Sequence, residues 1–236
     1  MASPHPIVLV HGAWHGAWCW DQLQEILDQR GIPSIAVELP GHGDSELPLG
    51  DLLGDAAHVA AVLAAIDDDG VLVGHSYGGA VISQAAAGAT NVARLVYLTA
   101  FCLDVGESLS RSVTVEDLPA SPLNAAVIVT DGVLTLDAAL AGPALYADCA
   151  PADADAAVAR LGAQLVASFT QPTTAAAWRT LPSTYVLCTE DEAILPPLQA
   201  ALAERCSEVV ELAASHSPFL SMPEAVADIL EPLARA

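Results

Sequence analysis

The chain alternates short, continuously apolar runs with longer stretches in which apolar residues recur every three or four positions. The short runs are typical of buried strands, and the longer period is typical of amphipathic helices. The pattern predicts strands at Ile7–Val10, Ser34–Leu39, Val71–Gly74, Ala93–Ala100, Thr184–Thr189 and Glu208–Leu212. It predicts helices at Asp21–Gln29, Asp51–Ile66, Ala80–Ala87, Pro197–Cys206 and Pro223–Ala234. We therefore expect an α/β protein with a mostly parallel sheet of about six strands, flanked by helices.

The alternation stops between about residues 104 and 182, where Ala, Pro, Asp and Thr dominate. Here we expect short helices joined by loops, with helices at Ala138–Tyr146, Pro151–Leu161 and Thr173–Trp178. A long insertion between two strands of one sheet is often a lid over a functional site. The sequence thus predicts a single domain with a core at residues 1–103 and 183–236. A helical cap at residues 104–182 is inserted before the last two strands.

Composition excludes several classes of protein. Hydrophobic residues make up 53% of the 236 positions and charged residues 15%, which is too apolar for an intrinsically disordered chain. The 7 basic residues are all Arg, and against 29 acidic residues they leave a formal net charge of −22. Binding of nucleic acid through bulk positive charge is therefore excluded. The acidic surface should also repel anionic substrates.

We expect no association with a membrane, because even the long uncharged stretch Val71–Ala93 contains too many Gly and polar residues for a span. The N-terminus lacks the basic and apolar regions of a secretory signal, so a cytoplasmic location is expected. Five scattered cysteines without paired spacing agree with a reducing compartment. The sequence leaves a homodimer open.

The pentapeptide Gly74–Gly78 reads G-H-S-Y-G, with Ser76 at its centre. An apolar strand runs directly into it, and a helix rich in small residues leaves it. A strand–turn–helix of this kind forces its central residue into strained geometry and exposes its side chain near a helix N-terminus. The dipole of that helix favours developing negative charge. The context therefore predicts Ser76 as a nucleophile, whereas the five-residue pattern alone is also met in ordinary tight turns.

A serine nucleophile needs a base to take its proton, and the base in this architecture follows a late strand. His216 lies between the strand Glu208–Leu212 and the last predicted helix, so it is the predicted base. His15 and His42 are the alternatives. His75 adjoins the nucleophile in sequence and is not expected to face its hydroxyl across the turn.

An acid that orients the base is expected after the strand Thr184–Thr189. Glu190, Asp191 and Glu192 follow this strand, and Asp191 is preferred because a short side chain fixes an imidazole more tightly. Asp104, which follows an earlier strand, is the reserve candidate. The neighbouring glutamates are read as solvated loop charges.

Two backbone N–H groups should stabilise an oxyanion. Tyr77, directly after the nucleophile, supplies one, and Ala13 in the loop after the first strand supplies the other. A substrate pocket is expected from aromatic residues and from the glycine that lets this loop turn, although packing in the cap is an equal alternative for Phe169 and Trp178. The predicted pocket residues are Gly12, Trp14, Tyr146, Phe169, Trp178 and Phe219. Further apolar contributors are Leu123, Leu145, Leu165 and Leu220.

Six segments together resemble the α/β-hydrolase superfamily. They also look like its group of methylesterases, hydroxynitrile lyases and related pyrethroid-type bacterial esterases. The segments are HGAWHGAWCW at 11–20, ELPGHGDS at 38–45, GHSYGG at 74–79, YADC at 146–149, STYVLCTED at 183–191 and SHSPFL at 215–220. The resemblance implies Ser76, Asp191 and His216 as a catalytic triad, and Ala13 and Tyr77 as oxyanion donors. It also implies a helical cap over the site.

Two departures bear on the reaction. The lyases of this group resemble one another in a Thr before the oxyanion residue and a Lys after the histidine, where this chain has Gly12 and Ser217. Hydrolysis of small to medium, neutral, hydrophobic carboxylic esters through an acyl-serine is therefore the leading hypothesis, with no metal or cofactor. The alternatives are lyase or cofactor-free perhydrolase chemistry on the same triad, or a receptor that binds a small molecule.

Overall fold

A computed structural model describes residues 3–236. Its main sheet has the strand order β2-β1-β3-β4-β8-β9, and every neighbouring pair of strands is parallel. The strands are β1 (Ile7–Val10), β2 (Ser34–Val37), β3 (Gly70–Ser76), β4 (Val92–Ala100), β8 (Ser183–Cys188) and β9 (Glu208–Leu212). The predicted α/β class with a parallel sheet of about six strands is confirmed.

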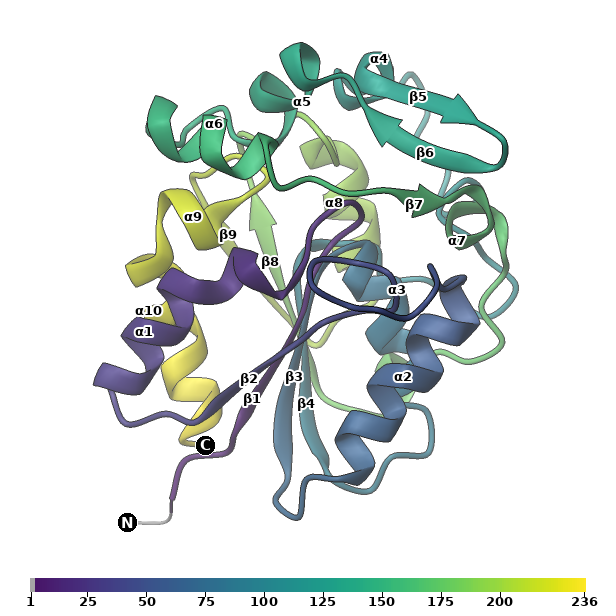
Figure 1. The fold of residues 1–236 in the computed structure, drawn as a ribbon. Coiled ribbons are helices and arrows are strands. Elements are labelled where there is room, and N and C mark those ends of the chain that lie inside the picture. The colour runs from purple at the N-terminus through teal and green to yellow at the C-terminus, as the bar shows by residue number, and fades with distance from the viewer. Residues whose placement is uncertain (1–2) are drawn as a thin grey trace.

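Helices cover both faces of this sheet (Figure 1). Side chains alternate along each strand, so Ile7 and Leu9 of β1 pack with α1 and α10, while Val8 and Val10 pack with α2 and α3. Because both faces are buried at the centre of the sheet, β1 is continuously apolar, whereas the edge strands β2 and β9 are partly exposed. The helices of the two layers are α1 (Asp21–Gln29) and α10 (Pro223–Ala234) on one face, and α2 (Leu52–Ala64), α3 (Tyr77–Ala85) and α8 (Pro196–Ala203) on the other.

The β3–α3 junction differs from its prediction in a way that matters for the site. The strand continues to Ser76, two residues beyond the predicted end, and the helix begins at Tyr77 instead of Ala80. Strand and helix are thus joined without a loop. Propensity could not show this, because glycines flank the serine and the turn is made by tertiary packing.

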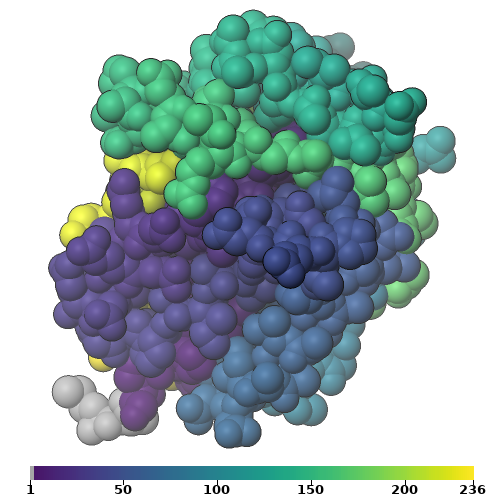
Figure 2. Space-filling view, in the orientation of Figure 1, coloured from purple at the N-terminus to yellow at the C-terminus, as the bar shows by residue number. Residues whose placement is uncertain are grey.

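Residues 104–182, here called the insertion, lie between β4 and β8 and extend across the carboxyl ends of the strands (Figure 1). In Figure 2 they cover the top of the core, in teal and green. The predicted helices at Ala138–Tyr146 and Pro151–Leu161 are present, but they end earlier, at Leu145 and Val158. The elements of the insertion are α4 (Leu123–Ala126), β5 (Val127–Thr130), β6 (Val133–Leu136), α5 (Ala138–Leu145), α6 (Pro151–Val158), β7 (Gln164–Leu165), α7 (Val166–Thr170) and the 3-10 turn η2 (Ala177–Arg179).

The insertion is not purely helical, because β5, β6 and β7 form a small antiparallel sheet that the sequence analysis did not predict. Asp131 and Gly132 join β5 to β6, both with positive φ (49° and 80°). An Asp-Gly pair between apolar runs is a strong hairpin signal and could have revealed it. The predicted helix Thr173–Trp178 is wrong. Of this stretch only Ala177 and Trp178 are helical, in η2. Thr173 instead donates its backbone N–H to the carbonyl of Glu107 and its hydroxyl to the carbonyl of Asp104.

Two short helical elements complete the core beside the site. The 3-10 turn η1 (Ala17–Trp20) leads into α1, and α9 (Pro218–Ser221) leads into α10. Within residues 3–236, no helix combines the length and the apolar character that a bilayer crossing requires.

Candidate active site

Ser76 stands at the strained junction of β3 and α3. Its φ of 52° and ψ of −118° lie outside the backbone conformations that residues other than glycine normally adopt. Its side chain makes no capping hydrogen bond to α3. The flanking glycines permit this turn. A Cβ at Gly74 would lie 2.5 Å from the carbonyl oxygen of Gly78, and one at Gly78 would lie 2.5 Å from that of Val10. Close packing of strand against helix therefore forces the serine into its conformation.

His216 and Asp191 form a buried pair at the carboxyl ends of β9 and β8. The His216 Nδ1 atom lies 2.8 Å from Asp191 Oδ2, and the two residues are 1% and 2% exposed. Ser76 is less buried than either. Because Nδ1 donates to the carboxylate, Nε2 is left as the nitrogen that can accept a proton. Among residues 3–236, no hydrogen bond joins Ser76 Oγ to His216 Nε2.

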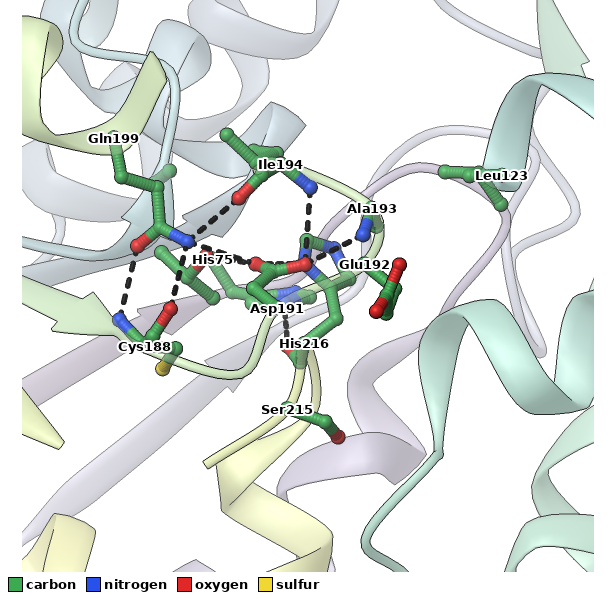
Figure 3. Close-up of polar contacts among 12 residues, drawn as sticks. His75, Leu123, Cys188, Asp191, Glu192, Ala193, Ile194, Gln199, Ser215 and His216 are labelled. Carbon is green, nitrogen blue, oxygen red and sulfur yellow. Dashed lines mark hydrogen bonds and ion pairs between the residues drawn. The ribbon is translucent and has the colours of Figure 1, made fainter. Parts of the chain in front are cut away.

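The Asp191 carboxylate is held by donors from three parts of the chain (Figure 3). Oδ1 accepts from the backbone N–H groups of Ala193 at 2.6 Å and Ile194 at 3.0 Å. Besides His216, Oδ2 accepts from Gln199 Nε2 at 3.2 Å and from the Thr99 hydroxyl. Five donors on one buried carboxylate satisfy both of its oxygens and fix its orientation.

The other carboxyl candidates are placed elsewhere. Glu190 and Glu192 are exposed, as the sequence analysis expected for them. Asp104 pairs with Arg179, and that hydrogen bond lowers the pKa of the Asp104 carboxyl. Of the four carboxylates considered, Asp191 is the one that contacts a histidine identified as a candidate base.

His75 has a role that the sequence analysis missed. Its Nε2 atom lies 2.8 Å from the backbone carbonyl of His216, and the two rings are 4.6 Å apart. A carbonyl can only accept, so His75 is the donor and holds the backbone of the candidate base. Burial, and next the nearby His216, lower the pKa of His75 well below its ordinary value, which keeps the ring neutral. Its position beside the serine in sequence gave no signal of this contact.

The loop after β1 lies directly against Ser76. A Cβ at Gly12 would lie 3.0 Å from Ser76 Cβ and 2.8 Å from His75 Nδ1, so no larger residue fits without movement. Trp14 has a positive φ of 62°, which turns the loop sharply after Ala13. The N–H of Tyr77 lies at the start of α3. The structure therefore brings the chain around Ala13 close to the serine.

His15 and His42, the alternative bases, are occupied by other contacts. His15 Nδ1 lies 2.9 Å from the carbonyl of Ala13, and its Nε2 lies 2.8 Å from the Tyr146 hydroxyl. His42 contacts the carbonyl of Pro40 at 3.0 Å and Gln164 Oε1 at 2.8 Å. Both rings thus link a core loop to the insertion.

The predicted pocket residues have different surroundings. The half-buried ring of Phe169 lies 5.6 Å from the ring of Trp14 and stacks on the ring of Tyr77 at 6.3 Å. It therefore packs between the loop after β1 and the first residue of α3, which carry the candidate oxyanion donors. Phe219 is fully buried against Trp20 and His75. A substrate contact for these side chains stays a prediction.

Trp178 and Tyr146, two further candidates for the pocket, form hydrogen bonds to other protein groups. The Trp178 indole donates to the carbonyl of Leu103 at 2.8 Å, and the guanidinium groups of Arg179 and Arg205 lie over its ring. Tyr146 is 2% exposed and is bonded to His15. For metals, no cluster of three or more His, Cys, Asp or Glu side chains with suitable geometry occurs in residues 3–236.

In α/β hydrolases, a serine in a strained turn, then an acid, then a histidine follow successive strands of a parallel sheet in this chain order. Ser76, Asp191 and His216 have this arrangement here. The chain belongs to the alpha/beta hydrolase family, whose model matches residues 7–229. The resemblance inferred from the sequence is thereby confirmed.

Individual relatives support the same assignment. An alpha/beta hydrolase of Aspergillus novofumigatus, nvfD, is 31% identical over 93% of this chain and 92% of that protein. A carbendazim hydrolyzing esterase of a Nocardioides species is 40% identical over 43% of this chain and 44% of that protein. Among solved structures, a pyrethroid hydrolase from Sphingobium faniae aligns with a TM-score of 0.86 and 28% identity over 98% of both chains.

Proposed function

We propose that this protein is a serine hydrolase that cleaves carboxylic esters through an acyl-serine intermediate, with Ser76 as nucleophile, His216 as base and Asp191 as the acid that orients it. The observation that carries the proposal is the buried Asp191–His216 pair at the end of the sheet where Ser76 occupies a strained turn. Such strain has no structural benefit of its own and is typical of a reacting group. Membership of the hydrolase family and an esterase among the relatives support the reaction class.

In the first half of the reaction, His216 Nε2 takes the proton of Ser76 while Oγ attacks the ester carbonyl carbon. Catalytic hydrogen bonds that are absent in a free enzyme often form only when substrate is bound, and we expect this for the bond between Ser76 Oγ and His216 Nε2. The N–H groups of Ala13 and Tyr77 stabilise the negative oxygen of the tetrahedral intermediate. His216 then gives the proton to the departing alcohol, and acyl-Ser76 remains.

In the second half, water attacks the acyl carbon, and His216 takes its proton as base. Collapse of the second tetrahedral intermediate releases the carboxylic acid and returns the proton to Ser76. Throughout, Asp191 stays ionised and stabilises the imidazolium form of His216. The five donors around Asp191 hold its carboxylate in place beside His216.

We infer that the substrates are small to medium, neutral, hydrophobic esters. The formal net charge of −22 disfavours anions near the surface. The rings of Trp14 and Tyr77 both pack against Phe169, and this apolar packing around the residue that follows Ser76 supports a hydrophobic substrate. Gly12, Tyr146, Trp178 and Phe219 complete the proposed pocket.

The test is turnover of p-nitrophenyl acetate and of a panel of methyl esters and lactones by the purified protein. We expect Ser76→Ala to lose roughly 10³- to 10⁶-fold in turnover, with the protein still folded by circular dichroism. A fluorophosphonate should label the wild type and not Ser76→Ala. Full activity of Ser76→Ala would overturn the proposal.

Lyase and perhydrolase chemistry on the same residues is the second candidate, and a binding protein without turnover is the third. A side chain at position 12, where the lyases of the resembling group have Thr, would crowd Ser76 and His75, which favours hydrolysis. Assays of a cyanohydrin, of peroxide-dependent oxidation and of an ester, run side by side, separate the reactions. Slow turnover with tight binding of a small molecule would favour the receptor.

We further propose a reducing, cytoplasmic setting, because all five cysteines are free thiols in the structure. The cap role of residues 104–182 and the pairing of two copies into a homodimer are proposals of the same kind. Light scattering on the purified protein would determine the number of copies.

A further inference from the structure

The segment Tyr146–Cys149 (YADC) is singled out by the sequence, and none of its residues takes part in the chemical steps described above; only Tyr146 is assigned so far, to the proposed pocket. It lies in the insertion, immediately after α5. Two of its side chains reach back to the core, and each contacts a different loop of the proposed active site. Tyr146 contacts the loop after β1, and Asp148 contacts the loop after β9.

Asp148 holds the loop that carries the base. Its Oδ2 atom accepts from the backbone N–H of Ser215 at 2.9 Å and from the Ser221 hydroxyl at 2.9 Å, and its Oδ1 accepts from the Ser215 hydroxyl. Ser215 directly precedes His216 (Figure 3), and its side chain is buried. Hydrogen bonds to a carboxylate are stronger than those between neutral groups. The insertion therefore fixes the chain one residue away from the base.

Tyr146 holds the loop that carries an oxyanion donor. The carbonyl of Ala13 can only accept, so His15 donates to it through Nδ1, and neutral His15 then accepts from the Tyr146 hydroxyl through Nε2. This chain of two hydrogen bonds runs from the insertion to the residue whose N–H would bind the oxyanion. Gly162, also in the insertion, donates to the carbonyl of Trp14 at 2.7 Å.

We propose that Tyr146 and Asp148 are positioning residues that hold the loop bearing Ala13 and the loop bearing His216 in their catalytic places. The insertion would then set the catalytic geometry as well as cover the substrate. This inference rests on the proposed function, because it assigns both loops their catalytic roles. Misplacement of a reacting group by about 1 Å from a distant change can lower a rate roughly 100-fold.

The test compares Asp148→Ala, Asp148→Asn and Tyr146→Phe with Asp155→Ala, an exposed carboxylate of α6 in the same insertion, as the matched control. Active sites are counted by fluorophosphonate labelling, so that kcat refers to folded, reactive enzyme. We expect Asp148→Ala to lower kcat per site roughly 10- to 100-fold with little change in KM, and to move the acid limb of the pH profile. We expect Tyr146→Phe to lower kcat per site as well.

Asp148→Asn should retain most of the wild-type kcat, because its amide oxygen can accept from Ser215 N–H and Ser221 while its NH₂ donates to the Ser215 hydroxyl. A merely structural role would lower the melting temperature and leave kcat per site and the pH profile unchanged. That result for Asp148→Ala would overturn the proposal. If Asp148→Ala yields no labelled enzyme, Ser215→Ala tests the proposal in its place. We expect Ser215→Ala to lower kcat per site roughly five- to tenfold. An unchanged kcat per site would contradict the positioning role of Asp148.

The experiments distinguish a failure of the positioning proposal from a failure of the proposed function. If Ser76→Ala keeps its turnover, the triad is wrong. If Ser76→Ala is inactive while Asp148→Ala and Tyr146→Phe have the same kcat per labelled site as Asp155→Ala, the triad stands. In that case only the positioning role of Tyr146 and Asp148 is wrong.

Discussion

Thr99 donates a hydrogen bond to Asp191 Oδ2, the same carboxylate oxygen that lies 2.8 Å from His216 Nδ1. Thr99 stands near the end of β4 with a φ of 38°, a conformation that β-branched residues rarely adopt. Strain at a residue that contacts the proposed acid is the pattern expected of a functional position. β4 therefore contributes to the site alongside β3, β8 and β9.

Replacing Thr99 by Val should lower kcat/KM roughly 10- to 100-fold. The change removes the hydroxyl that contacts Asp191 and leaves the branching at Cβ, and hence the backbone preference, as it was. A hydrogen bond to a charged group contributes about 1.5–3 kcal/mol, which corresponds to that range. The measurement is kcat/KM for p-nitrophenyl acetate, with Thr90→Val on the surface as control. Equal values for the two variants would remove Thr99 from the site.

The parallel sheet and its flanking helices could be predicted because burial on both faces leaves a continuous apolar signal in the central strands, most clearly in β1. The chain order of a serine turn, a carboxylate and a late histidine could be predicted for the same reason, since each follows a recognisable strand. The structure then distinguishes Asp191 from its neighbours Glu190 and Glu192 by burial and by contact with His216.

The supporting contacts could not be predicted, because they join residues far apart in sequence. Thr99 and Gln199 meet at Asp191, and His75 meets the carbonyl of His216, through packing that no local pattern encodes. The small sheet of the insertion was missed for a different reason. Its strands have two to four residues, too short for a period to register.

Gly12→Ala should lower kcat at least 10-fold and leave the fold intact. An added Cβ would lie 2.8 Å from His75 Nδ1 and 3.0 Å from Ser76 Cβ, so the loop that carries Ala13 would have to move away from the serine. Gly142→Ala is the matched control, because its Cβ would meet nothing nearer than 3.7 Å. Per-site turnover of the two variants is compared. Wild-type turnover in Gly12→Ala would show that this close approach is unimportant for catalysis.

The protein should lose stability in mild acid because of its buried histidines. Burial lowers the pKa of His15 from 6.5 to about 4, and lowers those of His11 and His75 well below their ordinary value. Between about pH 4 and 6.5 the unfolded chain binds a proton at His15 that the folded chain does not. The contribution of neutral His15 to stability is therefore complete above about pH 6.5 and is lost as the pH falls toward 4, by about 3 kcal/mol. His11 and His75 act in the same direction.

Urea unfolding at pH 7.5, 6.0 and 5.0 measures this loss. His15→Gln should flatten the dependence of unfolding free energy on pH, whereas His58→Gln, on α2 and half-buried, serves as the control and should not. A variant of His15 with the slope of the wild type would contradict the assignment of the acid effect to this ring.

Asp55 has the opposite influence on stability. It is fully buried, its Oδ2 accepts from the Tyr77 hydroxyl at 2.6 Å, and its Oδ1 has no hydrogen-bond partner among residues 3–236. Burial raises the pKa of this carboxyl from 3.8 to about 6. Because the unfolded chain releases the proton more readily, ionisation of Asp55 favours unfolding as the pH rises from about 4, and the full effect is present above 6.

Asp55→Asn should therefore stabilise the protein at pH 7.5, by up to about 3 kcal/mol, and have little effect at pH 4.5. The amide oxygen can still accept from Tyr77, so the backbone of this proposed oxyanion donor should stay in place and kcat should be kept. Urea unfolding at the two pH values gives the difference, and the exposed Asp28→Asn controls for loss of a surface charge. An equal gain at both pH values would exclude titration of Asp55 as its cause. A lower stability at pH 7.5 would mean that the charged hydrogen bond to Tyr77 outweighs the cost of burying the carboxylate.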